Sequence, residues 1–352
     1  MSGPIRVGLL GYGFAGKTFH APLVAATEGL VLHAVASSDA AKVHADFPEV
    51  IVHHTPEALI ADDTVDVVIV ATPNDTHAPL AIAALDAGRH VVIDKPFALN
   101  LAQAREVVAK AQATGRLLQV FHNRRWDSDF LTIRAAIDSG VLGRVVHLES
   151  RIDRFRPQVR DRWREHATPG GGIWFDLGPH LIDQALQLFG LPDGVTVSLA
   201  LQRDGAQTDD WAHAVLTYGE RRVVLHAGML VAGGSARFTV HGTTGSAVKQ
   251  AADRQEAQLL SGMRPGDTGW GEDADPLVLY EGTAPARNIA ATPGDQRGFY
   301  AALAAARHGE ATPPVRPLEA LAVMAVIEAG VISAREGRTV ALPLTAQERE
   351  AW

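Results

Sequence analysis

Three groups of residues in this sequence have types and spacings that could perform chemistry. The first is the string from Gly11 to Gly16, which matches the pattern GxGxxG. The second is Lys95 followed by Pro96, and the third is the pair Asp176 and His180, four residues apart. A phosphate-binding turn, an ammonium group and a carboxylate–imidazole pair together indicate an enzyme that works with a bound dinucleotide.

The glycine string follows an apolar segment expected to be a strand, Ile5 to Leu10, and precedes a helix expected over Lys17 to Thr27. In that context the first glycine permits a tight turn, the second lets the backbone approach a pyrophosphate, and the third lets helix and sheet pack closely. The helix N-terminus faces the phosphate charge. We therefore predict a dinucleotide site formed by Gly11, Tyr12, Gly13, Phe14, Ala15 and Gly16.

The end of the second expected strand, Leu30 to Ala36, bears on the choice between NAD and NADP. An acidic residue at this tip would bind the ribose 2′-hydroxyl of NAD. The tip carries Ser37 and Ser38, which leave room for a 2′-phosphate that Lys42 or Lys17 could pair with. Asp39 argues the other way, because it could bind a ribose or repel a phosphate. We predict NADP, with NAD as the alternative.

Lys95 follows an expected strand, His90 to Ile93, in the string Asp94-Lys95-Pro96. Ligands of open parallel sheets bind outside the carboxyl ends of the strands. Lys95 is therefore expected where the nicotinamide ring should lie, and its ammonium could stabilise charge developing on a reacting oxygen. Pro96 restricts Lys95 to an extended backbone. The alternative is an ordinary surface lysine.

Asp176 and His180 lie near the start of a helix expected from Gly178 to Leu188, with Pro179 suited to its first turn. Their spacing lets them share one helix face. A histidine in the first turn is favoured in its neutral form by the helix dipole, and neutral imidazole can accept a proton from a hydroxyl. The alternative is a capping aspartate beside a surface histidine.

The first third of the chain alternates short strands with helices. Further strands are expected at 65–71 and 117–121, and helices at 56–61, 78–87 and 101–114, two of them ended by Gly88 and Gly115. Strict alternation predicts a parallel sheet covered on both faces. We expect an α/β Rossmann domain over residues 1–122.

The second half is predicted to be an α+β domain, residues 123–352, that binds substrate and mediates oligomerisation. One helix, 130–139, is followed by strands at 145–152, 195–202, 211–218, 222–230 and 236–241, an irregular loop at 262–281, and helices at 294–307 and 318–335. Consecutive strands with alternating polarity indicate an open, mostly antiparallel sheet. Its incompletely covered face predicts a homodimer or homotetramer.

Composition excludes several other classes of protein. The 352 residues are 47% hydrophobic and carry a net charge of −8, which argues against a nucleic-acid or anionic-membrane partner. The absence of cysteine excludes disulfides and thiolate chemistry. The 15 histidines show no metal-ligand spacing, so no metal is expected. Without a signal-like segment or an apolar run of about 18 residues, we expect a cytoplasmic protein.

The order and spacing of these motifs resemble the Gfo/Idh/MocA family (glucose–fructose oxidoreductase, inositol dehydrogenase and rhizopine catabolism) over essentially the whole chain. The resemblance rests on the glycine string, on 71–77 (ATPNDTH), on Asp94-Lys95-Pro96 and on the Asp176/His180 pair; the family more often has glutamate at position 94. It implies that Lys95, Asp176 and His180 form the catalytic group. It also implies a cofactor cleft lined by Thr72, Pro73, Asn74, His77, Asp94 and Lys95.

Within the family, residues 121–130 and 153–164 look like those of bacterial scyllo-inositol dehydrogenases. This implies NAD(P)-dependent, reversible oxidation of a secondary hydroxyl of a cyclic polyol. Arg124, Arg154 and Trp163 are the expected substrate contacts, with surface ion pairing or plain packing as the alternative. Another sugar, a sugar phosphate or a dihydrodiol remains open as substrate, and so does a non-catalytic, NADP-binding sensor.

Overall fold

A computed structural model describes residues 3–352, which pack into two compact units. Unit 1 contains the chain up to Asn123 together with residues 255–270 and 295–321. Unit 2 contains residues 124–254, 271–294 and 322–352. The chain thus leaves unit 1 after Asn123 and returns to it twice, and no composition change in the sequence marks those returns.

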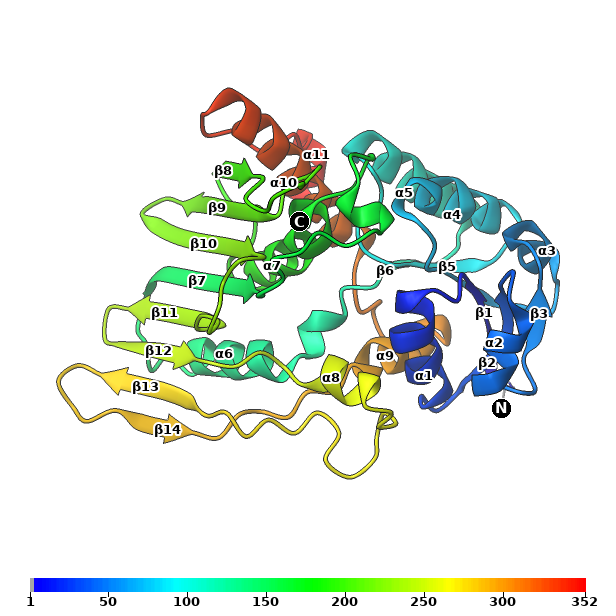
Figure 1. The fold of residues 1–352 in the computed structure, drawn as a ribbon, viewed down its shortest axis with the longest axis horizontal. Helices are drawn as coiled ribbons and strands as arrows, with labels where there is room; N and C mark the ends of the chain where they lie inside the picture. The colour runs from blue at the N-terminus through cyan, green and yellow to red at the C-terminus, as the bar shows by residue number, and fades with distance from the viewer. Residues whose placement is uncertain (1–2) are drawn as a thin grey trace. The chain divides into compact units, whose positions relative to one another are not determined.

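Six parallel strands form the sheet of unit 1, in the order β3–β2–β1–β4–β5–β6 (Figure 1). They are β1 (Ile5–Leu10), β2 (Leu30–Ala36), β3 (Ile51–His53), β4 (Val67–Val70), β5 (His90–Ile93) and β6 (Leu118–Val120). Apart from the short edge strand β3, each consists mostly of buried apolar residues, which suits a sheet covered on both faces. The predicted Rossmann architecture is confirmed.

Helices cover both faces of this sheet. Helices α3 (Pro56–Ala61), α4 (His77–Asp86) and α5 (Leu101–Thr114) lie on one face, and α1 (Ala21–Ala25) and α9 (Arg297–Arg307) on the other (Figure 1). Gly88 and Gly115 follow α4 and α5 with φ of 77° and 63°, as predicted for C-terminal caps. The remaining elements are the turns η1 (Gly16–His20) and η2 (Asn74–Thr76), α2 (Ala40–Asp46) and α8 (Gln255–Leu260).

Unit 2 contains an eight-stranded sheet in the order β14–β13–β12–β11–β7–β10–β9–β8. The strands are β7 (Val145–Asp153), β8 (Gly194–Ala200), β9 (Trp211–Tyr218), β10 (Arg221–Gly228), β11 (Phe238–Gly242), β12 (Gly245–Lys249), β13 (Leu277–Glu281) and β14 (Arg287–Ile289). All neighbours are antiparallel except β7 and β10, so the predicted mostly antiparallel sheet is confirmed. The prediction of an irregular loop at 262–281 is wrong for its last five residues, because these form β13 and pair with β12.

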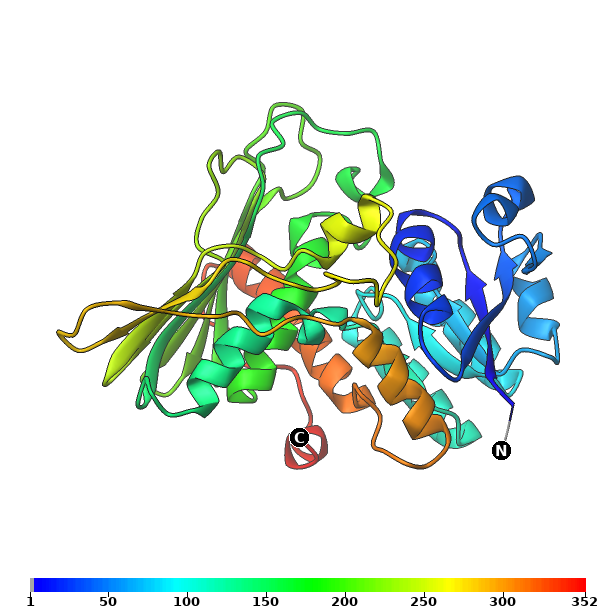
Figure 2. The ribbon, with the colours of Figure 1, turned by 90° about the horizontal axis from the view of Figure 1, so that it is seen from below.

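The helices of unit 2 lie on one side of its sheet, and among the described residues no helix covers the other side (Figure 2). They are α6 (Ser128–Asp138), α7 (Ile173–Phe189) and most of α10 (Pro317–Glu336); η3 (Asn123–Trp126), η4 (Trp163–Glu165) and α11 (Ala346–Glu350) are short. By length and hydropathy α10 could cross a membrane, which corrects the expectation that the chain has no such run. Because 61% of that apolar window is buried, α10 has the character of a core helix.

The buried His90 at the start of β5 makes the stability of unit 1 depend on pH. Its Nδ1 accepts a hydrogen bond of 2.9 Å from the backbone N–H of Leu117, so that nitrogen carries no proton. Burial, with the charges of Arg307 and Arg116, lowers the pKa of His90 to about 4. Above the ordinary histidine pKa the ring is neutral in both the folded and the unfolded state. As pH falls below that value, only the unfolded state takes up a proton, so the fold loses stability until the folded-state pKa is reached.

We expect the free energy of unfolding to drop by about 2 kcal/mol between pH 7 and pH 5 because His90 must be neutral in the fold. His90→Gln, whose amide oxygen can still accept the bond, should flatten this dependence. Urea unfolding of both proteins at the two pH values measures the effect. Equal pH slopes for wild type and variant would exclude His90 as its source.

Candidate active site

The glycine string lies where the strand order of unit 1 changes direction, between β1 and β4. Gly11 has φ of 92°, and a Cβ added there would lie 2.7 Å from the carbonyl oxygen of Ala71. A Cβ on Gly16 would overlap the carbonyl oxygen of Gly11. Both positions therefore require glycine, for the reasons that the sequence pattern predicts.

The outer side of this turn is open. No atom lies within 4 Å of a Cβ added to Gly13, and the neighbouring Phe14 is 56% exposed. Ligands of open α/β sheets bind outside the carboxyl ends of strands at such a switch point. The cradle therefore fits the phosphates of a dinucleotide.

The side chain of Tyr12 supports the turn from behind. Its hydroxyl donates to Asp46 at 2.9 Å, and burial, reinforced by Asp46, raises the pKa of Tyr12. Lys17 donates to the same carboxylate at 2.6 Å. Lys42 donates to the carbonyl oxygen of Tyr12 at 2.9 Å, which holds its ammonium beside the glycine turn. Of the two lysines considered for a 2′-phosphate, Lys17 is thus paired with Asp46, whereas Lys42 contacts the turn itself.

The residues after β2 divide into a capping group and an exposed serine. Asp39 caps α2 by accepting the N–H of Lys42 at 2.9 Å, and Ser37 accepts the N–H of Asp39 at 3.1 Å. Ser38 is exposed. One oxygen of the carboxylate that argued for NAD is therefore engaged in capping α2.

Two strand ends are joined by a histidine. His77 is buried, with Nδ1 2.8 Å from the carbonyl oxygen of Pro96 and Nε2 3.0 Å from that of Thr72. It thus bridges the loops that follow β4 and β5 and fixes the segment carrying Lys95, whose peptide bond to Pro96 is cis. The resemblance implied that His77 lines the cofactor cleft, whereas its side chain is buried and connects the two loops.

The other residues of the loop after β4 are held locally. The Thr72 and Thr76 hydroxyls lie 2.6 Å apart, and Thr76 donates to the carbonyl oxygen of Pro73 at 2.6 Å. Asn74 is buried at the start of η2. These bonds present the Thr72–Pro73 backbone beside the glycine turn, where Thr72 would contact a Cβ on Gly11.

Asp94, which precedes Lys95, belongs to a buried row of polar side chains that the sequence did not predict. The Asp94 carboxylate accepts the N–H of Lys95 at 2.9 Å and lies 3.8 Å from Nε2 of the buried His20. Nδ1 of His20 is 2.6 Å from the hydroxyl of Tyr300. Burial, with the charge of Asp94, raises the pKa of Tyr300, so its hydroxyl keeps its proton and donates to His20.

The charge of Asp94 persists despite its burial. Burial alone would raise its pKa, but the imidazole of His20 at 3.8 Å and the charge of Lys95 hold the pKa at about 2. Asp94 is therefore a permanent anion that anchors the backbone of Lys95. The only sequence signal was a lone histidine in an apolar helix, which carries little information by itself.

Helix α7 begins at Ile173, five residues before the predicted start. Asp209 caps it, accepting the N–H of Ile173 on its backbone oxygen and that of Trp174 on its carboxylate, both at 2.8 Å. Pro179 lies inside the helix. Asp176 is therefore in the first turn and His180 is not, so the predicted dipole effect on His180 is wrong. The cap comes from a distant segment, which local sequence cannot reveal.

A polar stripe runs along the otherwise apolar α7. Asp176, His180, Asp183 and Gln184 recur at helical spacing, and His180 is 6% exposed. Asp183 is held by Arg125 through hydrogen bonds of 2.6 and 2.9 Å. Burying such a row is costly unless its members are paired or hydrogen-bonded. Unit 2 therefore presents a carboxylate and an imidazole on one helix face.

The expected substrate contacts have mixed surroundings. Arg124 pairs with the buried Asp127 at 2.9 Å. Arg154 forms backbone hydrogen bonds with Gly228 and Val231, and Trp163 is half-buried. Arg164, which the sequence did not single out, has Nε 3.7 Å from the Asp176 carboxylate.

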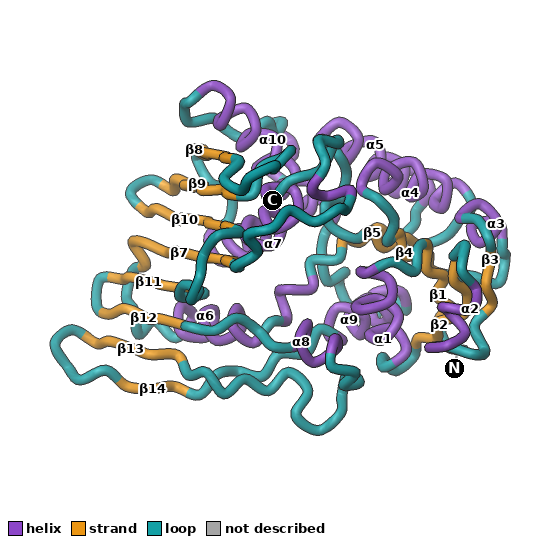
Figure 3. The backbone as a smooth tube through the Cα atoms, viewed as in Figure 1, coloured by secondary structure: helices purple, strands orange, loops and turns teal. Residues whose placement is uncertain are grey.

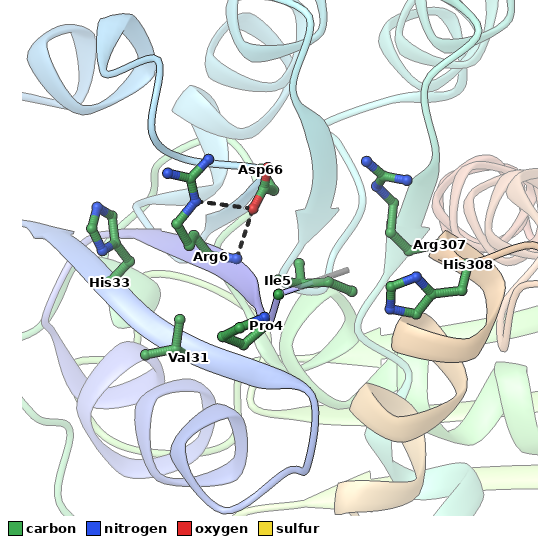
Figure 4. Close-up of a pocket in the computed structure, with 9 residues that line it drawn as sticks. Pro4, Ile5, Arg6, Val31, His33, Asp66, Arg307 and His308 are labelled. Carbon is green, nitrogen blue, oxygen red and sulfur yellow. Dashed lines mark hydrogen bonds and ion pairs between the residues drawn. The ribbon is translucent and has the colours of Figure 1, made fainter. Parts of the chain in front are cut away.

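Two further features lie outside this site. A pocket of about 560 Å³ at the N-terminal ends of β1 and β2 contains the Arg6–Asp66 pair and is flanked by Arg307 and His308 (Figure 4). It lies at the sheet edge opposite to the glycine turn and contains no predicted site residue. Among residues 3–352 no cluster of three metal-ligating side chains occurs.

Each unit thus gathers its own group of predicted residues. Unit 1 holds the glycine turn, the β2 and β4 ends and Lys95, and unit 2 holds Asp176 and His180.

Comparisons with known proteins cover nearly the whole chain. Residues 5–122 match the Gfo/Idh/MocA profile described as "Oxidoreductase family, NAD-binding Rossmann fold", and residues 134–342 match its "C-terminal alpha/beta domain". The uncharacterized oxidoreductase YdgJ of Escherichia coli is 52% identical over 97% of this chain and 100% of its own length. The scyllo-inositol 2-dehydrogenase (NADP(+)) IolW of Bacillus subtilis is 36% identical over 96% of both chains. A crystal structure of an oxidoreductase from Klebsiella pneumoniae, 54% identical, superposes with a TM-score of 0.94 over 99% of this chain and 98% of its own.

Proposed function

Because the chain belongs to the Gfo/Idh/MocA family of NAD(P)-dependent oxidoreductases, we propose that it oxidises a secondary hydroxyl of a cyclic polyol to a ketone, reversibly. The observation that carries this proposal is the polar stripe of α7, which offers a buried imidazole one turn from a carboxylate. The relative named scyllo-inositol 2-dehydrogenase supports an inositol-like substrate.

The proposed reaction combines transfer of a hydride with removal of a proton. The nicotinamide, when bound, accepts the hydride. His180 removes the hydroxyl proton, and Asp176 orients the ring or a neighbouring hydroxyl. Lys95, whose backbone is fixed by Asp94, stabilises the developing alkoxide with its ammonium. The Gly11–Gly16 turn and the β2 end hold the dinucleotide.

The paired arginines of unit 2 favour a neutral substrate over a sugar phosphate. Arg124 is matched to Asp127, and Arg162 and Arg203 are both matched to Glu165. A phosphate needs cationic donors that are not already committed to carboxylates. The relatives named D-glucoside 3-dehydrogenase and 1-carboxy-3-chloro-3,4-dihydroxycyclo hexa-1,5-diene dehydrogenase keep a glycoside or a dihydrodiol as the second candidate.

The test is a screen of inositols, glycosides and dihydrodiols with NADP and NAD, following absorbance of the reduced nicotinamide. The proposal expects the highest kcat/KM with an inositol. Turnover of glycosides or dihydrodiols alone would replace the polyol assignment by the second candidate. A chain that binds cofactor yet oxidises none of these would support the sensor alternative.

The β2 end leads us to propose NADP as the preferred cofactor. Ser38 is exposed, Asp39 is committed to capping α2, and the Lys42 ammonium is held beside the turn. We expect a higher kcat/KM with NADP than with NAD, and we expect Lys42→Met to lower the NADP value about tenfold, the loss of one charge-assisted bond. Kinetics with both cofactors measure the ratio. An equal or better NAD value in wild type would contradict the preference.

We also expect the uncovered sheet face of unit 2 to join copies of the chain. On this face β7 carries a short row of opposite charges, Glu149 followed two residues later by Arg151, with side chains 30% and 31% exposed. Laid antiparallel on itself about a twofold axis, such a row places acid opposite base. Light scattering should therefore give at least twice the 37.5 kDa mass of the chain.

Charge reversal tests this interface directly. Arg151→Glu should shift the protein towards monomer, because like charges then meet across the twofold axis. The double exchange Glu149→Arg with Arg151→Glu should restore the larger mass. A wild-type monomer at micromolar concentration would refute the interface, and so would an Arg151→Glu protein of unchanged mass.

A further inference from the structure

The pocket at the N-terminal ends of β1 and β2 lies apart from the residues assigned to the oxidation. It is lined by side chains of β1, β2 and α9 and of the segments next to them, all within unit 1 (Figure 3). Its volume of about 560 Å³ falls within the range of about 300–1,000 Å³ that small-molecule sites occupy. The pocket is therefore large enough for a ligand of its own.

Apolar and cationic side chains both line this pocket (Figure 4). Pro4, Ile5 and Val31 supply the apolar part, and Val31 is 38% exposed although it belongs to a strand. Arg6 extends from β1, and Arg307 is the last residue of α9. A lining of this kind suits a ligand that has an anionic group and a less polar remainder.

The guanidinium groups of Arg6 and Arg307 have donors to spare. Nε of Arg6 donates to Asp66 at 3.3 Å, whereas its two terminal nitrogens have no hydrogen-bond partner among residues 3–352. The side chain of Arg307 forms neither a hydrogen bond nor an ion pair with any residue of that range. A guanidinium offers N–H donors in a planar fork that matches two oxygens of a carboxylate or a phosphate. Both arginines can therefore bind an anion without giving up an existing bond.

The surrounding charges leave this corner of unit 1 positive. Asp66 is the one acid among the described residues that line the pocket, and it is matched to Arg6. Burial alone would raise the pKa of Asp66, but the hydrogen bonds and charge of Arg6, with the charge of Arg307, hold it below its usual range. Arg307 and Arg116 also contribute, after burial, to the lowered pKa of the nearby His90. In a chain of net charge −8, these arginines form a local excess of positive charge.

We propose that this pocket is a second ligand site, which binds a small molecule through a phosphate or carboxylate group. The fork of Arg307 donates to two oxygens of the anion, and the terminal nitrogens of Arg6 add further donors. The apolar side chains contact the remainder of the molecule. The dinucleotide is a different ligand, because the glycine turn follows the opposite end of β1.

The test is calorimetric titration of the protein with inorganic phosphate and with succinate at constant ionic strength, in the presence of saturating NADP so that the glycine turn is occupied. Arg307→Gln should weaken binding of the anion about tenfold, the contribution of a charge-assisted hydrogen bond. Arg134→Gln removes the same charge from an exposed position of α6 and should bind as wild type does. Tighter binding of phosphate supports a phosphorylated ligand, and tighter binding of succinate a carboxylated one.

NMR titration of His90 gives a second readout, which needs no variant. A bound anion offsets the charge of Arg307, so it should raise the pKa of His90 from about 4 towards its ordinary value, whereas chloride at the same ionic strength should not. The inference is overturned if neither anion binds at millimolar concentration, or if wild type and Arg307→Gln bind with equal affinity. Turnover enters neither measurement, so these outcomes leave the polyol function untouched.

Discussion

Replacement of His180 by alanine is expected to lower kcat for polyol oxidation by roughly two to four orders of magnitude, the usual contribution of a positioned general base. The imidazole is nearly buried on the polar stripe of α7, so solvent is poorly placed to replace it. In wild type, kcat/KM should rise with pH as the ring loses its proton and then level off. The alanine variant should lack this rise.

Binding and catalysis separate in this experiment. The dinucleotide is assigned to unit 1 and His180 to unit 2, so cofactor affinity measured by fluorescence titration should stay within about threefold of wild type. His308→Ala removes an exposed imidazole from the end of α9 and serves as the control with unchanged kcat. Near-normal turnover in His180→Ala would disprove its role as the base.

Elements with strong local signals were predictable from the sequence. β1, β2, β5, β9, α3 and α5 have the predicted bounds, because each is an apolar run or a periodic segment with its own stop signal, such as Gly115 after α5. The same holds for the glycine turn, where Gly16 is required by its contact with the backbone of Gly11, five residues earlier. Steric requirements between residues close in the chain restrict the residue type, so they can be recognised in the sequence.

Features that depend on distant partners were not predictable. The start of α7 is set by Asp209, more than thirty residues away along the chain. The anchor of Lys95 needs His20 and Tyr300, which belong to opposite ends of the sequence. The edge strands β3 and β14 are three residues long, too short for any periodicity to show. In each case tertiary contact, and no local pattern, decides the outcome.

Lys95→Met should lower kcat by roughly two to three orders of magnitude, because it removes the charge proposed to stabilise the alkoxide in the transition state. Methionine keeps most of the length of the stem, so the backbone bond from residue 95 to Asp94 and the cofactor affinity should both persist. Lys95→Arg retains a charge with different shape and should recover only part of the rate.

Lys110→Met provides the matched control for Lys95. It removes an ammonium of unit 1 that lies in α5 and pairs with Asp86 of α4. Single-turnover measurements with saturating cofactor then separate chemistry from product release. A Lys95→Met protein with an unchanged single-turnover rate would contradict the assigned charge stabilisation. A slow rate together with a cofactor affinity weakened more than about tenfold would instead make Lys95 chiefly a cofactor ligand, in which case Asp94, His20 and Tyr300 position a binding group.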